Sequence, residues 1–170
     1  MGVYSNVRTT AGTKLYVCAD RPSEQKKTCY DLLDWVEVGE ITEISDISKT
    51  FDIIEHNPIA TRKTQKIKSS FDIGDLVLTV AFVQDDDGQV VAHNSIKTDN
   101  YISIKIVLQD NTTFYFYGKM SSSKKVIGST SNIVSANLNL IINSEVIETY
   151  GFLLTINNWY SYYFEELCGY

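Results

Sequence analysis

Two histidines are the first side chains in this sequence that could support acid–base or metal chemistry. His56 and His93 belong to neither a G-x-S-x-G nor an H-E-x-x-H pattern, so neither has a nucleophile or second metal ligand at a useful spacing. We interpret His56 as part of a solvated turn with Asn57 and Pro58. His93 falls in a segment that we expect to be helical, where it would lie on an exposed face. The histidines therefore give no reason to expect catalysis.

The acidic run Asp85–Asp86–Asp87, followed by Gly88, is the second candidate for chemistry. A calcium loop of the EF-hand type alternates its ligands and ends on a glutamate, whereas these carboxylates are consecutive and no such glutamate follows. Carboxylates at the start of a helix accept hydrogen bonds from free backbone amides and oppose the helix dipole. The run therefore predicts a helix start, and we expect no metal, no cofactor and no enzymatic activity.

Three cysteines, Cys18, Cys29 and Cys168, show no CxxC or Cys/His metal spacing. Buried, unreactive thiols are the simplest interpretation, because cysteine is among the most buried residue types. The odd number leaves a disulfide between subunits as an alternative.

The composition is that of a single globular domain with an acidic balance. At 170 residues and 44% hydrophobic content the chain can bury a full core without metal or disulfide support. The net charge of −6 argues against strong nucleic-acid binding, which needs clustered lysine and arginine. We expect no membrane span and no signal peptide, because no apolar run is long enough, and hence synthesis in a cytoplasm.

A basic segment interrupts this acidic chain. It contains Arg62, Lys63, Lys66 and Lys68, and its +4 leaves −10 on the remainder of a chain whose net charge is −6. No aromatic residues alternate with the cations to stack on bases. Contact with an acidic surface on another copy of the chain is therefore favoured over contact with phosphate, which stays open as the alternative.

Hydrophobic periodicity predicts several strands and one helix. Residues 101–108 and 113–119 alternate with period two on either side of a turn and predict a hairpin. The helix should run from the acidic run to about Lys97, with Val90, Val91 and Ile96 directed inward. Further strands or apolar stretches are expected at 14–19, 35–44, 48–54, 74–83 and 134–142, with 20–28 as a polar loop and 56–70 as a long excursion from the sheet. This pattern is typical of a β-sandwich or half-barrel with one flanking helix.

The composition changes at the end of the chain. We expect residues 1–150 to form the domain, with a long loop at 55–70, and residues 151–170 to form an aromatic extension. So many aromatic rings are costly to leave in water, so the extension should pack on its own domain or on a neighbouring subunit. The candidate interface aromatics are Trp159, Tyr160, Tyr162, Tyr163 and Phe164.

Several segments, taken in order, resemble the tail tube proteins of tailed bacteriophages. The resemblance begins at Lys14–Val17 and becomes closer at Trp35–Thr42, which is similar to a W-x-E-V-G-E-[VI]-T stretch of that family. It is strongest at His56–Lys68, which is similar to the family's H-N-P-L-x-T-R-x-T-x-K-x-K loop. Leu76–Phe82, the acidic helix start and the hairpin Tyr101–Lys119 follow in the family's order, so the resemblance covers about residues 14–143.

The resemblance implies a structural virion protein that assembles into hexameric rings stacked as a tube. Inner strands of the β-sandwich would join an inter-subunit β-barrel around a lumen, through which the genome is delivered into the host. The long loop would reach neighbouring subunits or the next ring through His56, Asn57, Pro58, Thr61, Arg62, Lys63, Lys66 and Lys68. Implied partners are further copies of the chain, a tape-measure protein, tail terminator and distal tail proteins, and double-stranded DNA passing without specific binding. The location would be the phage tail.

Polar strand faces are the candidates for a lumen. A neutral or acidic lining would keep DNA from adhering to the wall. Ser103, Lys105, Ser135, Asn137 and Asn139 occupy such faces, although Lys105 fits awkwardly. Two other functions stay open, namely another tail component of the same fold, such as a distal tail or tail-completion protein, and a carbohydrate-binding module suggested by 11 tyrosines and 2 tryptophans.

Overall fold

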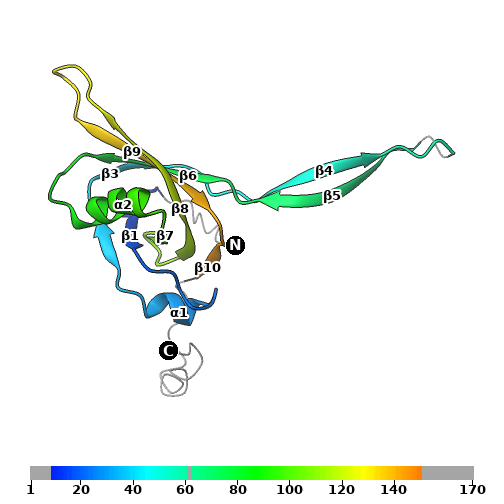
Figure 1. Ribbon diagram of the computed structural model, residues 1–170, viewed down its shortest axis with the longest axis horizontal. Coiled ribbons are helices and arrows are strands. Elements are labelled where there is room, and N and C mark those ends of the chain that lie inside the picture. Colours follow the sequence, from blue (N-terminus) through cyan, green and yellow to red (C-terminus); the bar gives the residue numbers. More distant parts are fainter. Residues whose placement is uncertain (1–8, 61–62, 151–170) are drawn as a thin grey trace, which may run out of the picture.

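The computed structural model describes residues 9–60 and 63–150 and shows a mainly β protein (Figure 1). Its elements are β1 (Lys14–Cys18), α1 (Lys27–Asp31), β2 (Val36–Val38), β3 (Ile41–Ile44), β4 (Thr50–His56), β5 (Gln65–Asp72), β6 (Asp75–Ala81), α2 (Asp87–Thr98), β7 (Tyr101–Val107), β8 (Thr113–Val126), β9 (Ser135–Ile142) and β10 (Ile147–Thr149). The mainly β fold class predicted from the sequence is confirmed.

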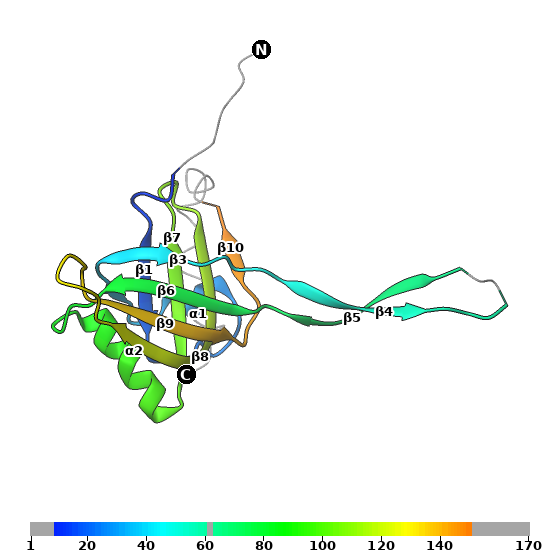
Figure 2. The ribbon, with the colours of Figure 1, turned by 90° about the horizontal axis from the view of Figure 1, so that it is seen from above.

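An eight-stranded antiparallel sheet folds over on itself to make the body (Figure 2). The strand order is β2-β1-β7-β8-β9-β6-β3, and β10 pairs with β8. The fourteen-residue β8 is the corner strand, because Thr113–Lys119 pairs with β7 and Gly118–Val126 pairs with β9. A shift in register between Met120 and Ser122 interrupts the ladder to β9 at the bend. One strand thus passes from one layer to the other.

The hydrophobic core lies between these two layers. In β7, Ile102, Ile104 and Ile106 are buried and belong to the same cluster as alternate residues of the second layer. Those second-layer residues are Leu76, Leu78 and Val80 of β6 and Ala136, Leu138 and Leu140 of β9. The period-two alternation predicted for β7 is confirmed, and β6 and β9 alternate in the same way, because each strand turns one face to the core.

Helix α2 begins at the acidic run, as predicted. The Asp86 carboxylate accepts hydrogen bonds from the backbone N–H of Gln89 at 2.8 Å and of Gly39 at 2.9 Å, so it caps the helix and ties it to the end of β2. A Cβ added at Gly88 would lie 2.5 Å from the Glu37 carbonyl oxygen, so only glycine permits this approach to β2.

One of the three residues predicted to face inward from α2 does not do so. Val91 and Ile96 pack against the core, but Val90 is 43% exposed. The buried stripe instead contains the small residues Gly88, Ala92 and Ser95, at helical spacing. Because small side chains let the helix approach the sheet closely, they face the body and Val90 is rotated outward.

The structure differs from the sequence-based strand predictions in three segments. The stretch 20–28 is not entirely a loop, because α1 begins at Lys27. Strand β4 does not join the body but pairs only with β5 among the described residues. The polar segment predicted as a loop contains β5 itself. Its sequence lacks apolar alternation because neither face of β5 is buried.

Candidate assembly surfaces

Strands β4 and β5 form a two-stranded arm that extends from the body (Figures 1 and 2). Their antiparallel register runs from Thr50 opposite Asp72 to His56 opposite Gln65. Every described residue of both strands is exposed. An isolated two-stranded hairpin is marginally stable in water, so its shape depends on local side-chain contacts and on whatever it binds.

Cross-strand contacts organise the half of the arm nearest the body. Phe51 and Phe71 lie 5.8 Å apart between ring centroids, and the Lys49 ammonium lies 4.0 Å from the Phe71 ring centroid. The Lys68 ammonium lies 4.8 Å from the Phe51 ring centroid. Contacts of this kind between adjacent strands stabilise a hairpin by roughly 0.2–1 kcal/mol each. Lys68, expected to contact a neighbour, therefore also contributes to the arm itself.

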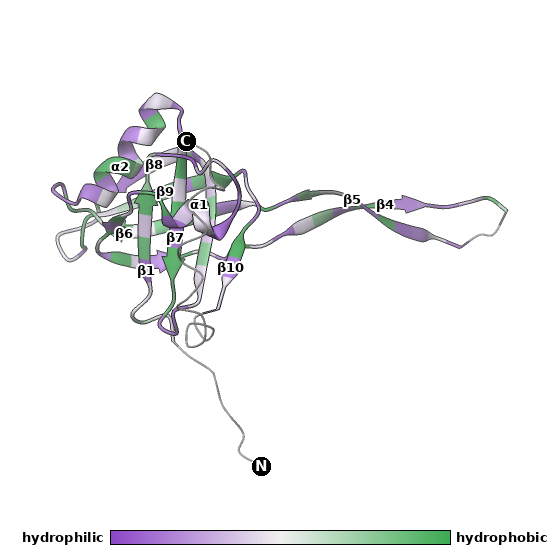
Figure 3. Ribbon diagram, turned by 90° about the horizontal axis from the view of Figure 1, so that it is seen from below, coloured by the Kyte–Doolittle hydropathy of each residue, from purple (hydrophilic) through white to green (hydrophobic). Residues whose placement is uncertain are grey.

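Farther along, the arm presents apolar side chains with nothing of the body above them. Ile53, Ile54 and Ile67 are all more than half exposed, and Ile59 beyond the end of β4 is 96% exposed. Figure 3 shows these apolar stretches between hydrophilic ones along the arm. Exposed apolar groups on an extended element are typical of a surface that another molecule covers.

The structure places most of the predicted contact residues on this arm. His56 ends β4, Asn57 and Pro58 follow it, and Lys63 precedes β5. Lys66 forms an ion pair with Glu55 at 3.1 Å across the hairpin. The predicted contact residues Thr61 and Arg62 lie outside the described residues.

The outer face of the second layer is the better of the two predicted lumen faces. Ser135, Asn137 and Asn139 of β9 point away from the core and are half-buried. They lie opposite Ala81, Thr79 and Val77 of β6 in the ladder. These six side chains are uncharged, and the charged residues next to them in the ladder are Lys124 of β8, opposite Asn137, and Glu43 of β3, opposite Thr79.

Ser103 does not lie on a lumen face, and that prediction is wrong. Its side chain is fully buried, and its hydroxyl donates a hydrogen bond to the Asp20 carbonyl oxygen at 2.7 Å. The segment that follows β1 covers this position. Lys105 shares the Ser103 side of β7, and its ammonium lies between the rings of Tyr16, Trp35 and Tyr115 at 5.3–5.8 Å. Because β7 and β9 turn opposite sides to the common core, the two predicted sets lie on opposite outer faces.

A cluster of aromatic rings occupies this other face, beneath α1. Tyr30 of α1 packs on Tyr115 at 5.4 Å between centroids, and both are buried together with Tyr117. The Tyr115 hydroxyl donates a hydrogen bond to Asp31 at 2.8 Å. The Tyr30 hydroxyl is buried and has no hydrogen-bond partner within bonding geometry among the described residues. The nearby Ser144 hydroxyl accepts a hydrogen bond from the Tyr117 N–H. Burial raises the pKa of Tyr30 to about 12, which the neighbouring Ser144 hydroxyl offsets only in part.

We expect Tyr30→Phe to leave stability at pH 8 unchanged or to raise it by up to about 1 kcal/mol, because it removes an unpaired buried hydroxyl. The pKa of Tyr30 is raised in the folded state above its usual value near 10 in the unfolded state. Stability of the natural chain should therefore fall as the pH rises from about 10 towards 12. Urea unfolding at pH 8 and at pH 11 measures the change. The free energy of unfolding should fall less between these two pH values in the variant than in the natural chain. An identical loss in both proteins would contradict this role of Tyr30.

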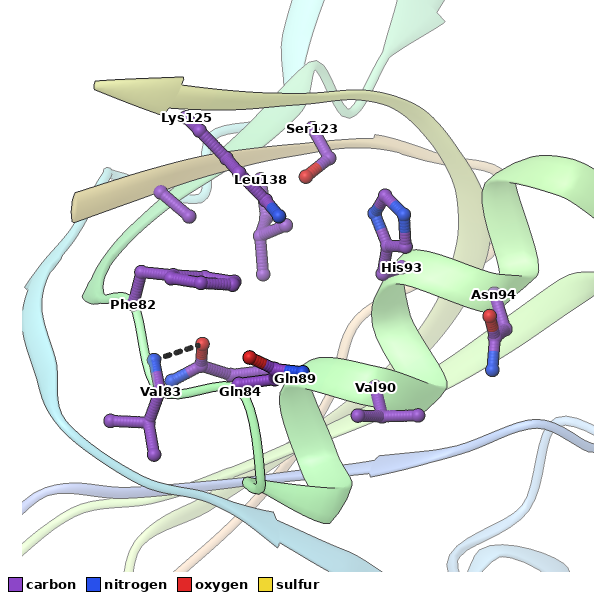
Figure 4. Close-up of a pocket in the computed structure, with 11 residues that line it drawn as sticks. Phe82, Val83, Gln84, Gln89, Val90, His93, Asn94, Ser123, Lys125 and Leu138 are labelled. Atoms are coloured by element: carbon purple, nitrogen blue, oxygen red, sulfur yellow. Dashed lines mark hydrogen bonds between the residues drawn. The ribbon is translucent and has the colours of Figure 1, made fainter. Parts of the chain in front are cut away.

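A small pocket lies between α2 and the strands β8 and β9 (Figure 4). Its volume is about 180 Å³. The floor is apolar, formed by Phe82, Ala136 and Leu138, and Val90 lines the side provided by α2. At the rim the Lys125 ammonium lies 4.0 Å from the Phe82 ring centroid. No motif in the sequence pointed to this pocket, because its lining comes from four separate elements.

The described part of the chain holds no group of three potential metal ligands among His, Cys, Asp and Glu. His56 and His93 are both exposed and lie on different elements. None of the described helices is long and apolar enough to span a bilayer.

The described cysteines are buried. Cys18 has a free thiol that accepts a hydrogen bond from the Asp20 N–H at 3.4 Å, and burial raises its pKa. A buried thiol cannot reach another subunit, so Cys18 does not supply the disulfide between subunits considered above. Cys29 is buried as well but is disulfide-bonded, so the expectation of an unreactive thiol is wrong for this cysteine. Cys168 and the aromatic candidates Trp159, Tyr160, Tyr162, Tyr163 and Phe164 lie outside the described residues.

The fold is similar to that of solved chains from tail-like particles. No protein-family model matches the sequence, and neither does any curated protein sequence. A chain from the 6-fold symmetrised baseplate of the anti-feeding prophage is 10% identical with a TM-score of 0.63, over 88% of this chain and 99% of that one. A chain from the sheath/tube terminator of the extracellular contractile injection system PVC is 12% identical with a TM-score of 0.60, over 86% and 99%. The SPP1 tail tube is 10% identical with a TM-score of 0.58, over 81% of this chain and 76% of that one. At these identities the likeness establishes the shared fold.

Proposed function

We propose that this chain is a structural subunit of a phage-type tail, which assembles into hexameric rings that stack as a tail tube. The observation that carries the proposal is the exposed arm, β4 and β5, on a body whose fold is shared with the SPP1 tail tube. The arm leaves the body on one side, and we place it against a different surface of the next copy. Contacts between unlike surfaces are heterologous, and they close into rings or extend as filaments.

The edges of the body sheet support the same proposal. Among the described residues, β2 pairs only with β1, β3 only with β6 and β10 only with β8, so the sheet has three strands with an open edge. Open edges promote uncontrolled pairing unless they are covered, and closing a barrel across subunits covers them. A structural role also accords with the lack of any convergent catalytic group in the described residues.

Electron microscopy of negatively stained protein tests the proposal directly. The purified chain should form six-fold rings or tubes as its concentration rises. A chain that stays monomeric at all concentrations, with its fold intact by circular dichroism, would contradict the proposal. A second candidate function is a terminator or cap component, which the similarity to the PVC terminator chain favours. A component of this kind would form single rings that do not stack, whereas a tube subunit would form long tubes.

We place the lumen on the outer face of β9 and β6. Asn137 is at its centre, with Thr79 of β6 and Lys124 of β8 beside it in the ladder. Lys124, and Glu43 of β3 opposite Thr79, bring charges of opposite sign to the two sides of this wall, and uncharged side chains lie between them. Such a wall, without an excess of positive charge, would let DNA and a tape-measure protein pass without strong adhesion. Lys105 has no part in this wall, because it lies on the opposite face of the body. Terminator and distal tail proteins would bind the ends of the tube, and the phage tail would be the location.

Labelling of an Asn137→Cys variant checks this placement. A maleimide attached to a protein carrier that is too large to enter the lumen should react with the cysteine at position 137 several-fold more slowly in tubes than in free subunits. A small maleimide should react with both. The natural chain provides the background, since Cys18 and Cys29 are buried. Equal carrier labelling of tubes and free subunits would show that Asn137 lies on the outside.

A further inference from the structure

We propose that the pocket between α2 and the β8–β9 hairpin receives the tip of the arm from a second copy, with Ile59 as the inserted side chain. The inference rests on the proposed assembly and names the surface that the arm contacts. Three properties of the described residues carry it, namely the shape of the tip, the size of the pocket and the charges around both.

The arm tip presents a single large apolar side chain. Ile59 is 96% exposed, next to the half-buried Pro58. Its neighbours along the chain, Asn57 and Ala60, are polar or small. A lone aliphatic group at the end of an extended hairpin stabilises no part of its own chain. It gains free energy only by entering an apolar site elsewhere, by about 1.5–3 kcal/mol if it becomes fully buried.

The pocket has the dimensions for one such side chain. Its volume of about 180 Å³ is close to that of cavities that hold a single benzene-sized group. Phe82 and Leu138 give it an apolar floor, and Val90 extends that surface along α2 (Figure 4). A docked Ile59 side chain would also cover Val90, which is otherwise 43% exposed on α2.

Charge complements this fit. The acidic run lies directly between two pocket residues, Gln84 and Gln89, and Asp85 and Asp87 are exposed. Asp86 is occupied by its hydrogen bonds to Gly39 and Gln89. On the arm, strand β5 begins at Gln65 near the tip. Lys63 lies just before this residue and Lys66 directly after it. Lys125, which lines the pocket, has the same sign as the arm lysines, but its ammonium lies over the Phe82 ring. Opposite charges beside an apolar contact steer association and fix its register, and Asp85 and Asp87 are the residues that would do so here.

The two surfaces lie at opposite ends of the molecule. In both Figure 1 and Figure 2 the arm extends from one side of the body, and the loop from β6 into α2 lies on the other. A strand as long as β4 spans roughly 23 Å, so the arm reaches well beyond its own body. An arm-to-pocket contact is therefore head to tail, as a ring or a stacked tube requires.

A second groove offers the alternative destination. It has a volume of about 450 Å³ beside β3, and its lining includes Ile44, Glu43 and Phe114. Thr10 and Thr13 line it as well, so it adjoins the start of the described chain. Its volume is more than twice that of the pocket at α2 and larger than one side chain needs, so it matches the tip less well.

Paired cysteines decide between the two destinations. Chains carrying Ile59→Cys are mixed with chains carrying Val90→Cys, or with chains carrying Ile44→Cys, and each mixture is assembled and oxidised. Because each chain holds one added cysteine, a link between the added positions joins two different copies. We expect the 59–90 peptide pair in mass spectra and a dimer band on non-reducing gels that is several-fold stronger than in the 59–44 mixture or with the natural chain.

The outcomes separate the inference from the proposed function. Tubes in which position 59 links to position 44, or to neither position, would overturn the pocket while leaving the tube intact. Absence of rings and tubes from the natural chain would overturn both. Ile59→Asp provides a second measurement, because a residue 96% exposed can change without unfolding the chain. It should stay folded and raise the concentration needed for assembly several-fold, whereas Ile59→Leu should not, and equal assembly of both variants would contradict the insertion.

Discussion

A chain in which residues 51–71 are replaced by an Asn-Gly turn should fold as stably as the natural chain and form no tubes. Thr50 and Asp72 face each other in the ladder, so a two-residue turn can connect the strands at that point. No described residue of the removed segment belongs to a buried cluster. The body should therefore keep its unfolding midpoint, while assembly loses the arm that we place against the next copy.

Denaturant unfolding and electron microscopy of the same samples check the two halves of this expectation. Leu32→Ser is a matched control, because Leu32 is exposed on the segment after α1, away from the arm and from the pocket. The control should form tubes. If the shortened chain formed normal tubes, the arm would not be needed for assembly and the prediction would be wrong. A large fall in its stability would show that the arm supports the body.

Gly118→Ala should destabilise the chain more than a typical surface substitution, by about 4 kcal/mol or more, because it forces backbone apart in the core. A Cβ at this position would lie 2.1 Å from the Ile141 carbonyl oxygen and 3.1 Å from Leu140 Cγ. Gly118 pairs with Ile102 on β7 and with Ile142 on β9, so both ladders meet there. Neither neighbour can move without opening a ladder, and the corner of the folded sheet would separate.

Gly128→Ala is the matched control, because a Cβ there would meet only Asn132, and both residues lie in the exposed loop between β8 and β9, which can shift without opening a ladder. Urea unfolding curves should show a large fall in midpoint for Gly118→Ala and a small change for Gly128→Ala. Similar midpoints for the two variants would mean that the corner has room to adjust. The close approach at Gly118 would then not limit the fold.

Local pattern determined the elements of the body. The alternation of Ile102, Ile104 and Ile106 requires a strand with one buried face, whatever it packs against. The acidic run likewise determined a helix start, because capping depends on neighbours within one turn, and Asp86 fulfils it. The absence of catalytic motifs was readable for the same reason, since such motifs are defined by spacing along the chain.

Segments whose conformation depends on partners remote in sequence were predicted less well. Strand β5 lacks apolar alternation because no layer covers it, so its polar sequence indicates a loop. Val90 appeared to face inward until the small residues of α2 were seen to take that side. Ser103 has the polarity of an exposed position, yet the Asp20 carbonyl oxygen covers it from a distant part of the sequence.

The sequence by itself thus determined a mainly β body, the helix start and a basic excursion, each of which depends on residues close together in the chain. Only the tertiary structure decided that the excursion is a paired arm with Ile59 exposed at its tip. It also decided that β7 and β9 present opposite outer faces, and that Phe82, Val90 and Leu138 converge on one pocket. The arm depends on the pairing of β4 with β5 apart from the body sheet. The outer faces and the pocket depend on how the sheet folds at β8, and no local periodicity records either arrangement.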